Sequence, residues 1–267
     1  MAVAEFRIHA ELNDFLPPAR RHRPFHLAVT RRASIKDVIE AFGVPHTEVD
    51  VIVVDGVSVG FDHRLEAEAN PRVAVYPWSR TPPLDRVRHL RPRPPMPPRW
   101  VLDVHLGRLA GYLRLLGFDC RYRNDMDDPQ LAACAVAEGR VLLTRDRRLL
   151  KRKCLTLAHF VRADTPRRQL EEVCRVFDLF DAFAPFTRCS HCNGLLTPVP
   201  KARVLHRLEP LTRRYVERFL ECTGCGRLYW HGSHVARMRE LVAELERGRP
   251  EGRSAHPANG APPLSCG

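Results

Sequence analysis

The sequence predicts an α/β protein with a central parallel sheet, a smaller domain before it and a metal-binding segment after it. Apolar strand and helix patterns alternate between residues 100 and 187. Alternating β and α units imply a parallel sheet that is covered on both faces. The first 79 residues follow the order ββαβββ, and two C-x2-C pairs come after residue 187. We therefore expect domains at 1–79, 99–187 and 188–240, a linker at 80–98 and a disordered tail at 241–267.

The composition of the 267-residue chain favours a polyanionic partner. The net charge is +12, and arginine supplies most of it. Arg and Lys contacts to phosphate provide much of the affinity for nucleic acid, although an arginine-rich composition also reflects genome base composition. Neither a signal peptide nor a membrane span is evident, so we expect a cytoplasmic protein. In that reducing compartment, nine cysteines favour metal binding over disulfides.

The first domain is expected to contain strands at 5–12, 25–30 and 72–77, a helix at 34–43 and an Asp-Gly hairpin at 49–59. This order resembles the ubiquitin-like β-grasp fold, which is also that of the ThiS and MoaD sulfur carriers. Those carriers end in a free Gly-Gly, whereas this domain continues as "VAVYPWSRTPP". The resemblance therefore implies an interaction module, for RNA or for a protein partner, rather than a sulfur carrier.

The proline- and arginine-rich segment 80–98 is expected to be an extended linker, because proline removes backbone donors and stiffens the chain. It serves either as a solvated spacer or as an RNA contact.

The α/β domain is expected to have four strands and three main helices. A further helix is expected to begin at Arg145. Asp128 and Thr165 are the expected helix caps, each followed by proline at the first helical position. The strands are expected at 100–104, 118–122, 141–144 and 154–158, and the helices at 106–117, 128–140 and 165–180.

Three carboxylates fall where such a domain places chemistry. Asp103 follows the first strand, Asp146 follows "VLLT", and Asp128 begins the second helix. In open parallel sheets, sites form at the carboxyl ends of the strands. Clustered carboxylates repel one another, and a hard cation such as Mg²⁺ or Mn²⁺ would hold them together. Individually, Asp128 is also a plausible helix cap and Asp146 a first-turn helix acid, so only the combination predicts a site.

These motifs, with "LDVHLGRLAGYLRLLGFDCRYRND" and the paired cysteines, closely resemble the Mut-seven C-terminal RNase family. That family joins a three-layer, PIN-like nuclease domain to a zinc ribbon. The resemblance implies cleavage of single-stranded RNA with Mg²⁺ or Mn²⁺ held by Asp103, Asp128 and Asp146. Related nucleases often carry a fourth acid, but Arg147 and Arg148 stand there. The nearby alternatives are Asp119, Asp125 and Asp127.

Three arginines are candidates for RNA phosphate contacts, namely Arg108, Arg114 and Arg145. Arg108 and Arg114 lie on the first expected helix, and Arg145 adjoins the third acid. Arginine binds phosphate bidentately. The alternative is that each belongs to a solvated helix face.

The two C-x2-C pairs predict a structural zinc ribbon with Cys189, Cys192, Cys222 and Cys225 as ligands. Four thiolates close the coordination sphere and leave no position for a reacting water. His191, His231 and His234 are weaker alternatives. The basic segment 201–219 between the pairs either contacts RNA or packs its own small core.

We therefore expect a metal-dependent ribonuclease. Two alternatives stay open: a non-catalytic RNA- or ribosome-binding protein, and a β-grasp adaptor that acts through a protein partner.

Overall fold

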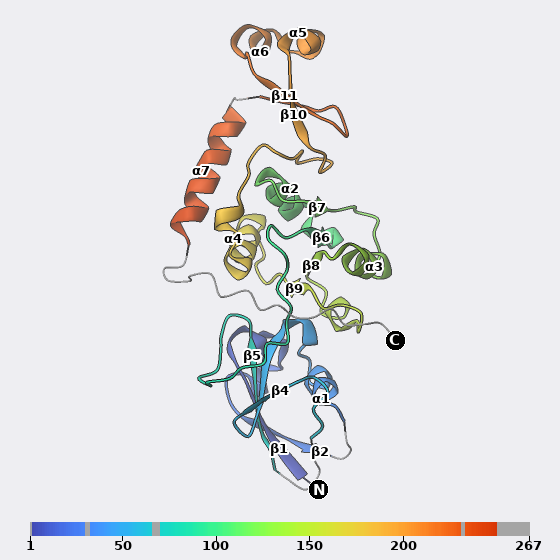
Figure 1. Cartoon of the computed structure of the whole chain (residues 1–267), viewed down its shortest axis with the longest axis vertical. Coiled ribbons are helices and arrows are strands. Elements are labelled where there is room, and N and C mark those ends of the chain that lie inside the picture. The colour runs from blue at the N-terminus through green and yellow to red at the C-terminus, as the bar shows by residue number, and fades with distance from the viewer. Residues whose placement is uncertain (1, 30–32, 66–69, 231–232, 250–267) are drawn as a thin grey trace.

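The computed structural model describes residues 2–29, 33–65, 70–230 and 233–249, with the backbone alone for residues 2, 29 and 233–238. Three bodies lie along the long axis of the molecule (Figure 1). The N-terminal domain occupies one end, the domain with the parallel sheet lies in the middle, and the cysteine-containing segment occupies the other end.

The N-terminal domain is a mixed five-stranded sheet with one helix across it. The predicted order ββαβββ is observed, and only β1 and β5 pair in parallel. Ser34 Oγ caps the helix by accepting a hydrogen bond from Asp37 N. Asp55 and Gly56 both have positive φ, as a two-residue hairpin turn requires. In the sheet order β2-β1-β5-β3-β4, the elements are β1 (Ala2–Ile8), β2 (Phe25–Val29), α1 (Ile35–Ala41), β3 (Val49–Val54), β4 (Val57–Val59) and β5 (Arg72–Pro77).

The linker 80–98 contains no helix or strand, as expected, but it is not a free spacer. Arg91 is buried, and its guanidinium lies 4.8 Å from the ring of Trp78. Its Nη2 donates to the carbonyl oxygen of Ala158, in the middle domain, at 2.7 Å. The expectation that no part of this segment packs is therefore wrong, because Arg91 fastens it between the two domains.

The middle domain confirms the predicted α/β architecture with a central parallel sheet. Its four strands are all parallel, in the order β7-β6-β8-β9. Trp100 and Leu102 pack into the core that contains α2 and α4, whereas Val101 packs into the core that contains α3. Helices therefore cover both faces (Figure 1). The elements are β6 (Trp100–Leu102), α2 (Gly107–Leu115), β7 (Cys120–Arg121), α3 (Asp128–Glu138), β8 (Val141–Thr144), β9 (Ala158–Phe160) and α4 (Pro166–Phe177).

Two expectations after β8 are wrong. The helix expected from Arg145 is only a short 3-10 turn, Leu149–Lys151, because Asp146 accepts a hydrogen bond from Arg148 N and forms a local turn. The strand expected at 154–158 begins at Ala158 instead. Leu155 of that apolar run is buried against α3 rather than paired in the sheet.

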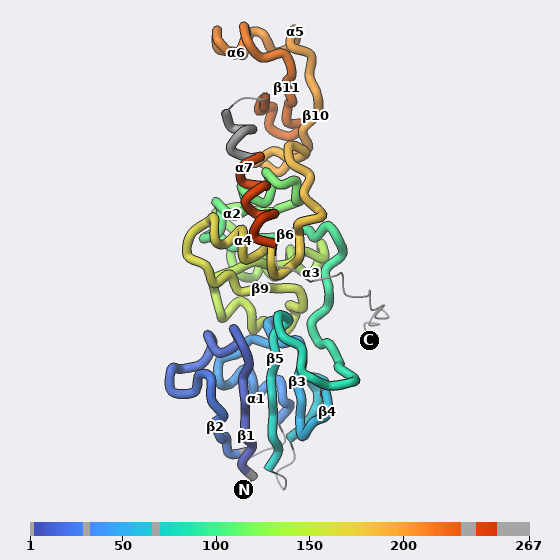
Figure 2. Tube along the Cα trace, turned by 90° about the vertical axis from the view of Figure 1, so that its left-hand side faces the viewer, coloured from blue at the N-terminus to red at the C-terminus, as the bar shows by residue number. Residues whose placement is uncertain are grey.

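The C-terminal segment forms a small antiparallel sheet and then a long helix. Helix α7 (Ser233–Arg247) runs beside α4 (Figures 1 and 2). Leu241 and Leu245 are buried in the core formed with α2 and α4. The predicted disordered tail is therefore wrong for residues 241–247, and residues 250–267 lie outside the described part. In sheet order, the strands are β10 (Leu196–Val199), β11 (Phe219–Cys222) and β12 (Leu228–Trp230), with α5 (Lys201–Val204) and α6 (Pro210–Tyr215) inserted after β10.

Among the helices of the described residues, none has both the length and the apolar composition that a bilayer crossing needs.

Candidate active site

The strand order places a topological switch point between β6 and β8. From β6 the chain crosses to β7 on one side, and from β7 it crosses back to β8 on the other. Ligand sites in open α/β sheets form outside the carboxyl ends of the strands at such a point. Asp103 follows β6, and Thr144 ends β8. The backbone N–H of Asp103 donates to Leu143 O at 3.0 Å, so the two strand ends are adjacent.

Thr144 links two of the predicted acids. Its Oγ1 donates a hydrogen bond to Asp103 Oδ2 at 2.6 Å and accepts one from Asp146 N at 2.9 Å. Asp146 Oδ1 in turn accepts from Arg148 N at 2.6 Å. Asp103 is only 5% exposed, and Thr144 is fully buried. The conformation of the loop after β8 is therefore fixed relative to Asp103.

A second contact fixes the loop after Asp103. Tyr122, which follows β7, donates from its hydroxyl to Val104 O at 2.9 Å. The ring lies directly over Gly107, where an added Cβ would come within 2.7 Å of the Tyr122 ring. Glycine is therefore needed at this close approach. The contact between Tyr122 and Gly107 was not predicted from the sequence. The one indication of it in the sequence is a glycine at the start of the helix after Asp103.

The third acid, Asp128, lies in the first turn of α3 but does not cap it. Asp127 is the cap, in a capping box with Gln130, so the prediction of Asp128 as cap is wrong. Burial, and next the negative charges of Asp146 and Asp103, raise the pKa of Asp128 above its ordinary value. The three acids therefore lie close enough to repel one another.

The three carboxylates do not converge as closely as the four cysteines do. Only the four cysteines described below bring three or more metal-binding side-chain atoms within 4.8 Å of one another in the described part of the chain. The three carboxylates remain further apart. Of the alternative acids, Asp119 pairs with Arg140 at 2.8 Å, and Asp125 pairs with Arg123 at 2.6 Å.

Two of the three predicted RNA-binding arginines are engaged elsewhere. Arg114 is buried and donates to the carbonyl oxygens of Cys120 and His191, at 2.8 and 2.7 Å. It therefore fastens the C-terminal segment to α2 rather than facing solvent, and its prediction as a phosphate contact is wrong.

Arg145 turns toward the segment after β9. Its guanidinium donates to Arg162 O at 3.2 Å and to Ala163 O, and it pairs with Asp164 at 2.8 Å. Phosphate binding would compete with these contacts, so the structure does not support Arg145 as a free phosphate contact.

Two other cations, Arg108 and Arg152, have no ion pair among the described residues. Arg108 is exposed on the first turn of α2. Arg152 is half-buried, and its positive charge acts to lower the pKa of Asp128. Sequence reasoning overlooked Arg152, because it is one of several cations in "RDRRLLKRK".

The four predicted zinc ligands converge. Cys189 Sγ lies 3.7 Å from Cys225 Sγ, and Cys192 Sγ lies 3.3 Å from Cys222 Sγ. Tetrahedral zinc with Zn–S bonds of about 2.3 Å places sulfur atoms roughly 3.8 Å apart. An added Cβ on Gly194 would meet Cys222 Sγ at 2.9 Å, so glycine is required beside the sulfur atoms. The predicted Cys₄ set therefore fits zinc. His191 is exposed, His231 lies outside the described residues, and the side chain of His234 is not described.

The electrostatics of these thiols also favour a cation. Burial acts to raise the pKa of Cys189, but hydrogen bonds from Tyr229 and from backbone N–H groups outweigh it and lower the pKa to about 6. Burial and then the neighbouring thiols raise the pKa of Cys192 to about 12. Four thiolates without a metal would repel one another, whereas Zn²⁺ between them reverses that effect.

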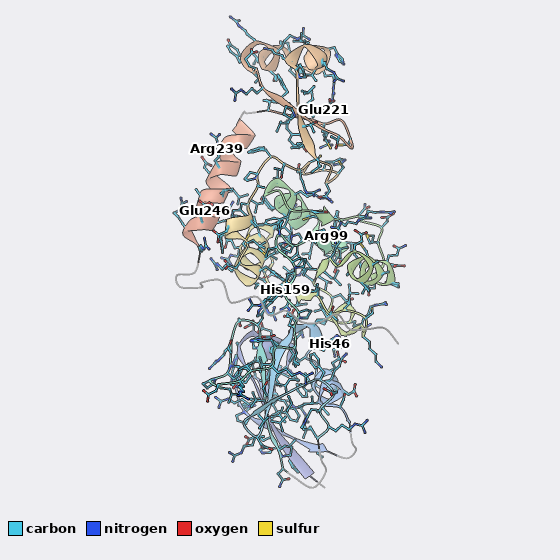
Figure 3. All side chains as sticks on the ribbon, viewed as in Figure 1. His46, Arg99, His159, Glu221, Arg239 and Glu246 are labelled. Atoms are coloured by element: carbon cyan, nitrogen blue, oxygen red, sulfur yellow. The ribbon has the colours of Figure 1, made fainter. Side chains whose placement is uncertain are left out.

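The N-terminal domain docks onto the middle domain through buried charges. Figure 3 shows His46 and His159 at the junction of the two domains. His46 Nε2 lies 2.9 Å from Leu155 O. Glu48 is 3% exposed, accepts from Phe160 N at 2.8 Å and pairs with Arg162 at 2.9 Å. Edge strand β9 is therefore covered by η3 (His46–Glu48) of the N-terminal domain.

Comparison with protein-family models gives two matches. The Mut7-C RNAse domain matches residues 98–242, and the Mut7-C ubiquitin domain matches residues 1–82. No curated protein and no solved structure matches the chain. Residues 83–97 of the linker separate the two matched regions, and the match to the RNAse domain contains the three acids and the four cysteines.

Proposed function

Because the chain belongs to the Mut7-C RNAse domain family, we propose that it is a metal-dependent ribonuclease that hydrolyses single-stranded RNA. One observation carries the proposal. Asp103 and Asp146 are linked through Thr144 at the switch point of the parallel sheet, and Asp128 is affected by the charges of both. We also assign the middle domain to the PIN-like class, on its strand order and on the acids at the strand ends.

The acids fit a hard cation. Their donor atoms are carboxylate oxygens, the ligands that Mg²⁺ and Mn²⁺ prefer. Burial raises the pKa of Asp128, and the charges of Asp146 and Asp103 add to that effect, which a bound cation would oppose. Because the carboxylates lie apart, water would complete the coordination of a cation among them. Such a cation, when bound, supplies an activated water and stabilises developing negative charge on phosphate.

The side chains of this site have separate tasks in that reaction. Thr144 orients Asp103 through its hydroxyl, and the turn at Arg148 orients Asp146. Asp128 belongs to the first turn of α3. Arg108 and Arg152 are the cations we assign to the phosphates of the strand, in place of Arg114 and Arg145.

The N-terminal domain would act in the same chain as a docked positioning module, and we place the enzyme in the cytoplasm. A non-catalytic RNA-binding protein is the second candidate. The separation of the three carboxylates favours it, because they do not by themselves form a closed metal site. Metal-dependent cleavage distinguishes the two candidates.

The experiment is cleavage of labelled single-stranded RNA by the zinc-loaded full chain, with and without added Mn²⁺. We expect Asp146→Asn to slow cleavage by about 100-fold or more, because loss of an outer-shell partner alone costs about 10–100-fold. Asp125→Asn is the matched control, since Asp125 is exposed and pairs with Arg123. Cleavage that neither Asp146→Asn nor omission of Mn²⁺ changes would rule out this mechanism.

A further inference from the structure

The C-terminal sheet carries a second candidate binding site, away from the acids. A cavity of about 280 Å³ opens at the sheet whose strand β11 ends in Cys222. This volume is close to the lower limit for small-molecule sites. Its lining is largely apolar and aromatic, and it includes two cations and one acid. The residues that matter here are the aromatic Phe186, Tyr229 and Trp230 and the charged Lys201, Glu217 and Arg218.

Exposed apolar side chains are concentrated in this part of the molecule. Trp230 is 38% exposed, with its ring 6.2 Å from that of Phe219. Of the nine large hydrophobic side chains that are exposed among the described residues, five lie between 195 and 230. Of these five, Trp230 alone also lines the cavity. The five are Leu195, Leu205, Leu211, Tyr215 and Trp230.

The positive charge of the same region favours an anionic partner. Between residues 201 and 218 the chain has six Lys or Arg residues and two Glu residues. Lys201 pairs with Glu217 at 2.6 Å, and Arg207 pairs with Glu221. For Arg203 and Arg218, both exposed, the described residues provide no ion-pair partner. Basic side chains beside flat aromatic surfaces are the features that single-stranded nucleic acid requires.

From this combination we propose that the cavity is a subsite for one unpaired nucleobase of RNA, stacked on Trp230, with the adjoining phosphate on Arg218. The subsite rests on the proposed function for its role in cleavage. Arg114 and Asn193 fix the segment to the middle domain, since Asn193 Oδ1 accepts from Cys120 N at 2.9 Å. A base held here would therefore keep a set distance from the acids and would define where the strand is cut.

The test measures binding rather than cleavage. The zinc-loaded full chain carrying Asp146→Asn is titrated with a labelled oligouridylate and with an abasic oligonucleotide that has the same number of phosphates. Loss of one stacked base weakens binding by about 5- to 100-fold. We expect that loss for Trp230→Ala with the oligouridylate alone, and near-normal affinity for Trp230→Phe.

Two further variants separate stacking from charge. Arg218→Ala should weaken binding of both oligonucleotides and reduce the salt dependence by about one phosphate contact. Leu211→Ala is the matched control, because Leu211 is 72% exposed and does not line the cavity. Zinc content of each variant verifies that the sheet has folded. If Trp230→Ala loses zinc, tryptophan fluorescence of the wild type and of Trp230→Phe is compared instead. Bound oligouridylate should then quench the emission of the wild type more than that of Trp230→Phe.

The outcomes distinguish this inference from the ribonuclease proposal. Unchanged oligouridylate affinity for a folded Trp230→Ala protein overturns the subsite, as does an equal loss with the abasic oligonucleotide. Equal quenching in the wild type and Trp230→Phe overturns it when Trp230→Ala does not fold. Base-dependent binding at Trp230 by a wild type that cleaves no RNA supports the subsite and rejects the ribonuclease. Cleavage that depends on Asp146, with no dependence of binding on Trp230, supports the ribonuclease and rejects the subsite.

Discussion

Replacing Glu48 by glutamine should loosen the contact between the N-terminal and middle domains. Glu48 is 3% exposed and stands opposite two cationic side chains of the middle domain. Its Oε2 pairs with Arg162 at 2.9 Å, and its Oε1 lies 3.3 Å from His159 Nδ1. Glutamine keeps the size of the side chain and an oxygen for the N–H of Phe160, but it removes the charge and turns an amide N–H₂, which cannot accept a hydrogen bond, toward Arg162.

The expected cost is about 3 kcal/mol. Removing one member of a buried ion pair typically costs about 3–5 kcal/mol, because the partner is left buried without compensation. The lower end applies here, since Arg162 keeps Asp14 at 3.2 Å and His159 keeps Glu172 at 3.1 Å. Such a loss lowers the docking equilibrium constant by about 100-fold.

Hydrogen exchange at the Phe160 amide measures this effect directly, because that N–H donates to Glu48 Oε1 at 2.8 Å. Urea unfolding gives the accompanying change in free energy. Asp14→Asn is the matched control. Asp14 also pairs with Arg162, but it is 51% exposed, so its loss should cost less than about 1 kcal/mol. A Glu48→Gln cost below about 1 kcal/mol, or one equal to that of Asp14→Asn, would refute the reasoning.

Three further predictions concern the acids, the metal centre and pH. Thr144→Val should slow RNA cleavage by about 10- to 100-fold while the fold is kept, because Asp103 loses the hydroxyl that orients it; an unchanged rate contradicts this role. Cys222→Ser should lower the zinc content and the stability of the C-terminal sheet, measured by metal analysis and thermal unfolding; full zinc occupancy would reject the ligand set. Burial acts to lower the pKa of His159, but Glu48 and Glu172 outweigh it and raise the pKa above its ordinary value of 6.5. The stability that His159 contributes is therefore complete below pH 6.5 and is lost as the pH rises through the raised pKa. His159→Gln should flatten that limb of a urea-unfolding profile against pH, and an unaltered limb would contradict the assignment.

Glu48 determines how the stability of the docked protein changes on the acidic side of the same pH profile. Burial acts to raise its pKa, but His159 and Arg162 outweigh burial and hold the pKa far below its ordinary value of 4.5. Its contribution is present above pH 4.5 and is lost as the pH falls through the lowered pKa. Docking should therefore be tightest between about pH 4.5 and 6.5, where both contributions are complete.

Local patterns were sufficient to predict most strands of the first two domains, the main helices and the cluster of four cysteines. Apolar periodicity, the Asp-Gly turn and the C-x2-C spacing all depend on neighbours in the sequence. The pattern at 154–158 misled because Leu155 is buried against α3, and burial of a short apolar run does not distinguish a strand from a loop. The helix cap was misplaced by one residue, because both Asp127 and Asp128 have a side chain that can cap.

Side-chain partners distant in the sequence were beyond such patterns. Nothing near Arg114 indicates that it donates to His191 O, and nothing near Glu48 indicates that it reaches β9. Both contacts depend on how domains meet, which the sequence of either domain alone does not specify. Charged residues were consequently assigned to RNA when some of them hold the domains together.

The position at which related nucleases carry a fourth acid is occupied here by a residue that contacts the N-terminal domain. Arg147 directly follows Asp146, and its guanidinium lies 5.2 Å from the ring of Phe15 and 5.5 Å from that of Phe160. It also donates to Asp14 O at 3.1 Å. An acid in place of Arg147 would forfeit these contacts with the N-terminal domain. This loop therefore supplies Asp146 as an acid, while Arg147 beside it docks the N-terminal domain. A looser interface should also displace Asp146, because Arg147 in the interface directly follows it in the chain. Glu48→Gln should therefore lower RNA cleavage as well as domain docking, whereas Asp14→Asn should leave both nearly unchanged.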